Sequence, residues 1–200
     1  MPETEFSFRI DSLPVLIGTA ALILWVVSER LLHLVGLRQG RPIERETLSA
    51  HWHGVTFYGA IVFSFLDATV FNWTTIGSHL SSARYAGIPL LLVGFLVRIA
   101  SRLALGKQFS GHVQTTENHR LVTTGIYRLI RHPAYLAYLC LLVGFPLTFG
   151  SIAGLACALA SGIPALIYRI RIEETALERW FPDEYPVYRA KTRKLIPFLW

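Results

Sequence analysis

The sequence GKQFSGHVQTTENHRLVTTGIYRLIRHPAY, residues 106–135, is a polar stretch in a chain that is otherwise largely apolar. It carries three histidines and four cations, and it lies between two segments long enough to cross a membrane. A second polar block, residues 169–194, follows towards the end of the chain. Charge this dense beside lipid is tolerated only at the membrane interface or in a protein-lined cavity. We therefore expect the chemistry of the protein to lie in these two blocks.

The composition is that of a membrane protein. The 200 residues are 52% hydrophobic, and the mean hydropathy is +0.44, so one membrane domain is expected. The net charge of +6 comes mostly from cations that flank apolar segments. Such cations indicate membrane topology and contact with anionic lipids rather than nucleic-acid binding. Cys140 and Cys157 both fall in apolar segments, without the spacing of a disulfide framework or a metal site.

The apolar segments predict an all-α integral membrane protein with five transmembrane helices. Each is about 20 residues long, which corresponds to roughly 30 Å. The expected spans are residues 13–36, 52–71, 84–104, 134–150 and 151–171. The last two meet at Phe149-Gly150-Ser151 and should form a helical hairpin. We expect a single domain, 1–200, in which 1–83 hold the N-terminal spans and 84–200 form the functional core.

The distribution of lysine and arginine orients the chain. With the N-terminus outside, the inner segments carry fourteen of these residues, whereas the outer segments carry only Arg9 and Arg84. The positive-inside rule then places both polar blocks and the C-terminus in the cytoplasm. The short chain suggests a bacterial source and therefore the inner membrane.

Several charges lie inside the expected spans, where they usually pair or face water. At 1.5 Å per residue, Glu29 and Arg98 lie about 24 and about 21 Å from the outer ends of their helices. Asp67 lies near the outer end of its own helix. At these depths a Glu29–Arg98 pair is possible, whereas Asp67 and Arg98 should not meet.

Two groups of residues point to chemistry. Arg131-His132-Pro133 stands where a cytoplasmic loop enters a span, so its cations can face an anion beside the positive helix end. Glu173-Glu174 follow a span directly, and topology does not require such a double carboxylate at the membrane edge. Beyond it, near-helical spacing predicts a C-terminal amphipathic cytoplasmic helix. Its aromatic face would carry Leu177, Trp180, Phe181, Tyr185 and Tyr188.

Together the two blocks resemble the isoprenylcysteine carboxyl methyltransferases and their bacterial relatives. The resemblance covers about residues 84–200 and depends on the combination of several short motifs. These are Gly106-x-x-Phe109-Ser110, Val113-Gln114, His119-x-Leu121-Val122-Thr123-x-Gly125-x-Tyr127, Arg131-His132-Pro133-x-Tyr135, Glu173-Glu174-x-x-Leu177, Phe181, Glu184-Tyr185-x-x-Tyr188 and Pro197.

The resemblance implies a methyltransferase that uses S-adenosylmethionine, bound at the cytoplasmic ends of the helices. The acceptor would be hydrophobic or lipidated, most simply a prenylcysteine-type carboxylate, and would enter from the bilayer among the membrane lipids. The implied cofactor-binding residues are Gln114, His119, Leu121, Val122, Tyr127, Arg131, His132, Tyr135 and Glu174. The implied catalytic residues are Glu173, Glu174 and Arg169.

Physical chemistry is consistent with these roles. A glutamate could hold the donor's ammonium or a ribose hydroxyl, and Arg131 could hold its carboxylate. A carboxylate acceptor is ionised at pH 7 and needs no base, so rate would come from positioning and desolvation. Two positions depart from the family pattern, because Ala137 and Pro182 stand where glycine is common. Both are expected in or beside the pocket and bear on its shape.

Other functions stay open at this point. The acceptor could be a phospholipid amine or a small thiol, and either would need to lose a proton. A nicotinamide-dependent membrane reductase on the same scaffold and a non-enzymatic scaffold or transporter are further alternatives. The chain has no Gly-x-Gly-x-x-Gly loop after a strand, which argues against a soluble Rossmann methyltransferase. His51, His53, His112, His119 and His132 lack a ligand set at recognisable spacing, so no metal is expected.

Overall fold

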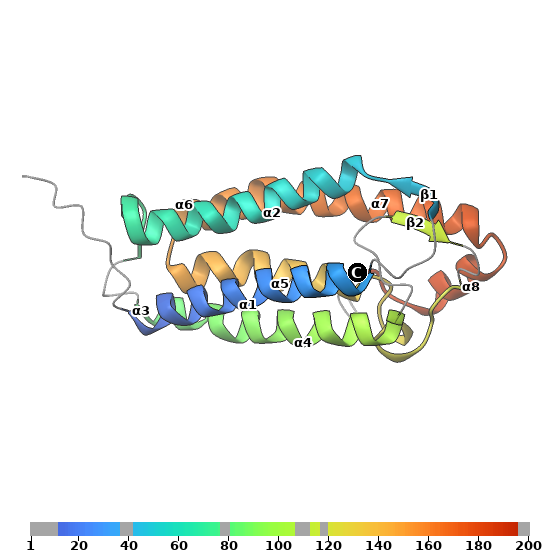
Figure 1. The fold of residues 1–200 in the computed structure, drawn as a ribbon, viewed down its shortest axis with the longest axis horizontal. Helices are drawn as coiled ribbons and strands as arrows, with labels where there is room; N and C mark the ends of the chain where they lie inside the picture. Colours follow the sequence, from blue (N-terminus) through green and yellow to red (C-terminus); the bar gives the residue numbers. More distant parts are fainter. Residues whose placement is uncertain (1–11, 37–41, 77–80, 107–112, 117–119, 196–200) are drawn as a thin grey trace, which may run out of the picture.

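A computed structural model describes residues 12–36, 42–76, 81–106, 113–116 and 120–195. Its helices run side by side along one long axis (Figure 1). In chain order they are α1 (Leu13–Gly36), α2 (Leu48–Leu66), α3 (Ser81–Tyr85), α4 (Gly87–Leu105), α5 (Pro133–Phe149), α6 (Ile152–Cys157), α7 (Ile163–Trp180) and α8 (Glu184–Lys191). Two π-helical segments, η1 (Asp67–Phe71) and η5 (Ala158–Gly162), and a 3-10 turn, η4 (Gly125–Arg128), complete the helical structure.

The helices confirm the predicted fold class. Four helical stretches are long and apolar enough to cross a membrane: Leu13–Leu31, Leu48–Phe71, Ser82–Leu105 and Ile152–Trp180. The fifth apolar helix, α5, has 17 residues and is about 25 Å long at 1.5 Å per residue. The five-span count therefore stays a prediction, although a helix stands at every expected span.

Local sequence sets the predicted hairpin between α5 and α6. Pro133 begins α5 in its first turn, where the missing N–H costs no hydrogen bond. Gly150 ends the helix in the left-handed conformation with φ of 75°, which glycine adopts without steric cost. Ser151 then caps α6, because its hydroxyl accepts from the Gly154 amide at 2.9 Å.

The helix that follows is longer than predicted. α6, η5 and α7 form one helical stretch that continues to Trp180, nine residues beyond the expected end at 171. Leu177 and Trp180 consequently lie on α7, whereas Tyr185 and Tyr188 lie on α8. The predicted amphipathic helix is thus divided by a turn at 181–183. Charged residues such as Arg171 and Glu178 suggested a helix end, but they are exposed on a helix that has left the apolar region.

Glycines let α4 and α5 approach closely. A Cβ on Gly87 would lie 2.2 Å from Thr148 Oγ1, and one on Gly94 would lie 2.8 Å from Leu141 Cγ. Small residues of this kind allow close packing of membrane helices. Trp25 of α1 is fully buried and packs edge-on against Phe95 of α4, with ring centroids 5.8 Å apart. The N-terminal helix is therefore part of the same core.

The predicted pairing of intramembrane charges is confirmed. Arg98 Nη2 donates to both carboxylate oxygens of Glu29 at 3.0 Å, and Arg102 Nη2 donates to the same carboxylate at 3.2 Å. Asp67 does not meet Arg98. It is fully buried at the other end of the bundle and accepts from the hydroxyls of Thr74 and Ser151, each at 2.6 Å.

Two short strands were not predicted. β1 (Pro42–Glu46) pairs antiparallel with β2 (Val113–Thr116), in the register Arg45 to Gln114. They lie at the same end of the molecule as α8 (Figure 1). The pairing joins segments about 70 residues apart, which local periodicity does not reveal.

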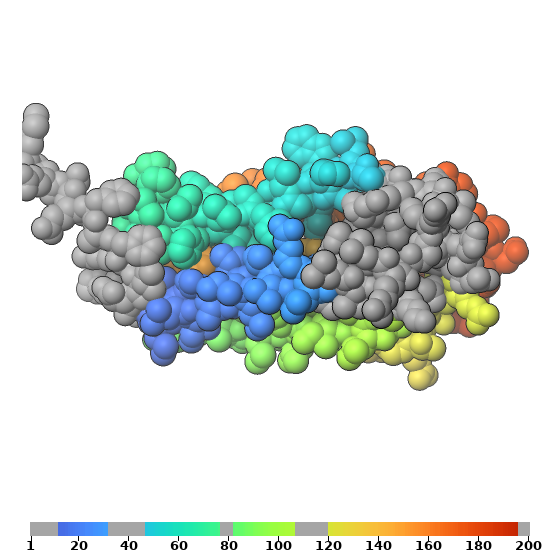
Figure 2. Space-filling model, viewed as in Figure 1, coloured from blue at the N-terminus to red at the C-terminus, as the bar shows by residue number. Residues whose placement is uncertain are grey.

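The outer surfaces of the helices are apolar. Leu24 of α1, Val62 of α2 and Leu96 of α4 are each at least half exposed. Figure 2 shows α1 lying between α2 and α4 along this face of the molecule. Exposed apolar area on this scale indicates contact with lipid. The chain is an integral membrane protein.

Candidate functional site

The two polar blocks meet at one end of the bundle, around the carboxylate of Glu174. Arg131 Nε donates to Glu174 Oε1 at 3.2 Å, and His132 Nε2 lies 3.4 Å from the same oxygen. Lys194 Nζ lies 2.9 Å from Glu174 Oε2. The Glu174 side chain is only 10% exposed, so several cationic or hydrogen-bonding groups hold one buried carboxylate. The predicted meeting of residues 131–132 with the glutamate pair is observed.

The end of the described chain returns across this cluster. The amides of Arg131 and His132 donate to the carbonyls of Arg193 and Lys194, at 2.8 and 3.1 Å. Arg131 Nη1 also donates to the carbonyl of Thr192 at 2.5 Å. Arg131 therefore fixes residues 192–194 and Glu174 at once. No sequence signal pointed to this return, because it depends on backbone hydrogen bonds.

A second set of hydrogen bonds involves Glu173. The Tyr135 hydroxyl donates to Glu173 Oε2, and Arg169 Nε donates to that hydroxyl at 3.2 Å. Arg169 Nη1 donates to the Ser49 hydroxyl at 2.5 Å. Glu173 is the more open of the two glutamates, with 30% of its side chain exposed. The predicted residues Tyr135, Arg169 and Glu173 thus lie together, with Ser49 of α2 as an unpredicted member.

The tyrosines of α8 and η4 close the other side of the cluster. The Tyr188 hydroxyl donates to the Tyr127 carbonyl at 2.7 Å, and Tyr185 is completely buried. Burial raises the pKa of Tyr127, Tyr185 and Tyr188 above the ordinary tyrosine value. These hydroxyls stay protonated at neutral pH and do not act as bases. The Tyr185 hydroxyl and His132 Nδ1 are buried without a hydrogen-bond partner among the described residues.

The structure gives positions for the remaining predicted site residues, except for one that lies outside the described range. Leu121 and Val122 are half-buried in the extended segment before η4. Gln114 lies in β2, and its backbone is paired with Arg45. His119 lies outside the described residues.

The structure also places the two residues that depart from the family pattern, Ala137 and Pro182. Ala137 is fully buried on α5, where its carbonyl lies 3.1 Å from the place a Cβ on Gly94 would take. It therefore belongs to the α4–α5 contact. Pro182 is exposed in the turn between α7 and α8. Among the described residues, no group of three or more His, Cys, Asp and Glu could hold a metal ion.

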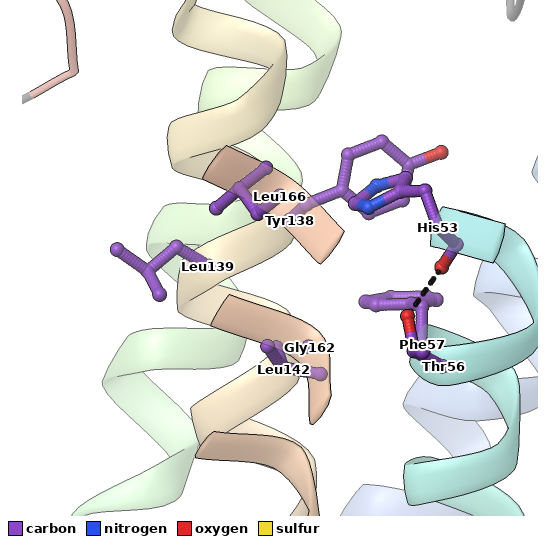
Figure 3. A pocket seen from close by; sticks show the side chains of 8 residues that line it. All are labelled: His53, Thr56, Phe57, Tyr138, Leu139, Leu142, Gly162 and Leu166. Atoms are coloured by element: carbon purple, nitrogen blue, oxygen red, sulfur yellow. Dashed lines mark hydrogen bonds between the residues drawn. The ribbon is translucent and has the colours of Figure 1, made fainter. Parts of the chain in front are cut away.

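A small pocket opens between α2, α5 and the α7 stretch, next to the polar cluster along these helices. Its side chains lie close together and leave no room for a water-sized molecule. Figure 3 shows the rings of His53 and Tyr138 meeting edge-on, with Phe57 beside them. His53 and Tyr138 have ring centroids 4.6 Å apart. In the sequence His53 stands out only among histidines that lack a metal-ligand set, and that pattern does not connect it with the site.

Fold and site together define a helical membrane protein with a cluster of cations and carboxylates at one end. Residues 83–184 match the family model described as phospholipid methyltransferase. The chain belongs to this family.

Named relatives narrow the comparison. A protein-S-isoprenylcysteine O-methyltransferase of Saccharomyces cerevisiae is 30% identical over 151 residues, 74% of this chain and 62% of the relative. The human protein of the same name is 27% identical, over 74% of this chain and 53% of that one. Protein-S-isoprenylcysteine O-methyltransferase A of Arabidopsis thaliana is 30% identical over 56% of this chain and 58% of its own length. This chain spans about half to three fifths of the length of these curated relatives.

A solved structure has the same fold. It is a eukaryotic intramembrane Ras methyltransferase, an isoprenylcysteine carboxyl methyltransferase. The TM-score is 0.52 at 25% identity, over 76% of this chain and 52% of that one. The expected resemblance is therefore confirmed by family, by sequence and by fold.

Proposed function

We propose that this protein is a membrane methyltransferase that uses S-adenosylmethionine to methylate the carboxylate of a prenylcysteine-type acceptor. The observation that carries the proposal is the junction of the two polar blocks, in which Tyr135 and Arg131 contact Glu173 and Glu174. The junction combines anionic, cationic and hydrogen-bonding groups next to an apolar pocket. The names of the relatives support the choice of acceptor.

The residues of the cluster fit the charges of the methyl donor. Glu173 has an exposed face that suits an ammonium or a ribose hydroxyl, and the unpartnered His132 Nδ1 lies 3.8 Å from its Oε1. Among the described residues, Arg131 bonds through Nε and Nη1, so its Nη2 would hold a carboxylate. S-adenosylmethionine, when bound, would supply an electrophilic methyl group on a sulfonium cation.

The chain's own residues would then position and desolvate the reactants. Tyr135 and Arg169 hold Glu173 in one orientation, so this carboxylate needs no reorganisation when a cation arrives. Glu174 is already saturated by Arg131, His132 and Lys194. We therefore assign donor binding to Glu173 and a supporting role to Glu174. An acceptor carboxylate is ionised at pH 7, so the reaction requires no general base.

The other predicted site residues complete the proposal. Leu121, Val122 and Tyr127 would line the donor pocket beside Arg131, His132 and Tyr135, with Gln114 and His119 added by the resemblance alone. The lipid-like acceptor would enter from the bilayer. All of 1–200 would act as one domain, because α2 supplies Ser49 to the cluster. The cluster would face the cytoplasm of a bacterial inner membrane, in keeping with the distribution of cations.

Calorimetry on detergent-purified protein tests the proposal. Wild-type protein should bind S-adenosylmethionine and S-adenosylhomocysteine, and Glu173→Gln should weaken binding by roughly tenfold or more, because a charged hydrogen bond is lost. Glu184→Gln, on an exposed glutamate of α8, is the matched control and should bind as wild type.

An acceptor screen with labelled donor then separates the alternatives. Methyl transfer to a prenylcysteine analogue supports the proposed acceptor, whereas transfer only to a phospholipid amine or a thiol replaces it. Folded protein that binds a nicotinamide nucleotide and no S-adenosylmethionine would instead be a reductase.

A further inference from the structure

His53 is a polar residue whose polarity the protein's own fold does not use. Both ring nitrogens are shielded from solvent, and neither has a hydrogen-bond partner among the described residues. The ring packs against three aromatic side chains: Tyr138 at 4.6 Å, Tyr135 at 6.0 Å and Phe57 at 6.4 Å between centroids. A phenylalanine would satisfy these contacts equally well. An unpaired buried donor lowers stability, and such groups are rare in native proteins.

His51, two residues earlier on the same helix, shows the contrast. It is exposed, and its Nδ1 lies 2.7 Å from the Thr47 carbonyl. The sequence therefore offers one histidine with an ordinary local contact and one whose nitrogens are shielded and unpaired beside the pocket. A polar group that destabilises the free protein without an internal partner indicates a function.

The position of His53 suggests what it contacts. On α2 it lies one helical turn from Ser49, which binds Arg169 of the polar cluster. One turn along α5 from Tyr135, Tyr138 packs edge-on against His53. His53 therefore stands at the boundary between the polar cluster and the apolar part of the pocket.

The pocket beyond His53 is apolar. Leu142 of α5 and Gly162 of η5 line it, and a Cβ on Gly162 would lie 2.5 Å from Leu142 Cδ2. Gly162 ends a π-helical segment, a distortion that is frequent at functional sites. In this structure the lining side chains leave no room for even a water-sized molecule. A hydrocarbon chain would therefore enter where these helices move apart.

We propose that His53 hydrogen-bonds the amide next to the carboxylate of the acceptor, and so selects acylated S-alkyl amino acids over simple alkyl carboxylates. This inference rests on the proposed function. A prenylcysteine-type acceptor has three polar groups at its head. Its carboxylate reacts in the cluster and its thioether is a weak acceptor, which leaves the amide as the group that requires a partner once buried.

Two acceptors that differ only in this amide test the proposal. One is an N-acetyl S-prenylcysteine, and the other is the S-prenyl thiopropionate that lacks the acetylamino group. Wild type should have a KM about tenfold lower for the amide-bearing acceptor, as expected for a buried hydrogen bond. His53→Phe should raise that KM about tenfold and abolish the preference, while leaving the KM of the thiopropionate and S-adenosylmethionine binding unchanged. His53→Gln should keep part of the preference, and the control His51→Phe all of it.

Thermal unfolding provides a second measurement. His53→Phe should unfold at the same or a higher temperature than wild type, because an unpaired buried group has been removed. An unchanged preference in both His53→Phe and His53→Gln would overturn the proposal. If wild type methylates neither acceptor, the proposed function fails and the role of His53 fails with it. If wild type methylates both with equal KM, only the role of His53 is overturned.

Discussion

Lys194 and Glu174 form an ion pair, 2.9 Å between Nζ and Oε2, that ties the end of the described chain to α7. Arg131 and His132 approach the other carboxylate oxygen from the start of α5. Glu174 therefore joins three segments that are far apart in the sequence. The neighbouring Glu173 accepts from the Tyr135 hydroxyl, lies 3.8 Å from His132 Nδ1 through its Oε1, and keeps an exposed face. Adjacent glutamates thus have different environments and should respond differently to mutation.

Glu174→Gln should destabilise the protein by about 3 kcal/mol, because removing one partner leaves buried cations without compensation. Glu173→Gln should cost under about 1 kcal/mol, because its side chain is partly exposed and its partner Tyr135 is neutral. Thermal unfolding of both variants in the same detergent measures the difference. Equal unfolding temperatures would contradict the assignment of Glu174 as the structural glutamate.

The sequence was informative where one physical constraint dominated. Span length fixed the position of the helices, and depth in the bilayer was enough to pair Glu29 with Arg98. Pro133, Gly150 and Ser151 marked helix ends by their backbone and capping preferences. The family resemblance, rather than periodicity, predicted which residues of the two polar blocks belong to the site, such as Arg131 and Glu174.

Features that depend on tertiary contacts could not be found in this way. The β1–β2 pairing and the return of residues 192–194 depend on backbone hydrogen bonds between distant segments. The π-helical segment η5 adds one residue to a turn without a compositional signature. His53 looked like part of a weak His-x-His pattern, and only the structure showed that its nitrogens are buried and unpaired.

Glu29→Gln should lower the free energy of unfolding by about 3 kcal/mol. The variant leaves the Arg98 guanidinium, 7% exposed, without its counter-ion in the apolar part of the bundle. Glu29→Leu combined with Arg98→Met should recover much of this loss, because replacing both partners of a buried pair by apolar groups is often neutral. Chemical denaturation in mixed micelles would compare the single and double variants. A double variant less stable than both single variants would contradict the argument.

Asp67→Ala should destabilise the opposite end of the bundle without affecting donor binding. Asp67 is fully buried and accepts from the Trp73 amide at 3.0 Å as well as from Thr74 and Ser151. Its loss leaves several donors unpaired, at a cost of about 3 kcal/mol. Calorimetry at a temperature where the variant is folded should give the wild-type affinity for S-adenosylmethionine. A weakened affinity would mean that the two ends of the bundle are coupled.

Gly87→Leu should prevent α4 from packing on α5. A Cβ at this position would meet the Thr148 hydroxyl at 2.2 Å and the Gly144 carbonyl at 2.6 Å, so the helices would have to separate. We expect a loss above about 3 kcal/mol, as for severe overpacking. Gly59→Leu is the matched control, because a Cβ there would have no atom within 4 Å. If the Gly87→Leu variant unfolds at the wild-type temperature, α4 can shift without a loss of stability.

Reporter fusions should determine both the orientation and the number of spans. A fusion after Trp200 is expected to be cytoplasmic, because the positive-inside rule places the residues that follow α7 there. A fusion after Ser151 should be external, which would show that the 17-residue α5 crosses the membrane. Alkaline phosphatase, active only outside, and green fluorescent protein, fluorescent only inside, give opposite signals at each position and so control for expression. If the fusion after Ser151 is cytoplasmic, α5 does not cross and the chain has four spans. If the fusion after Trp200 is external, the polar cluster faces away from the cytoplasmic S-adenosylmethionine on which the proposed reaction depends.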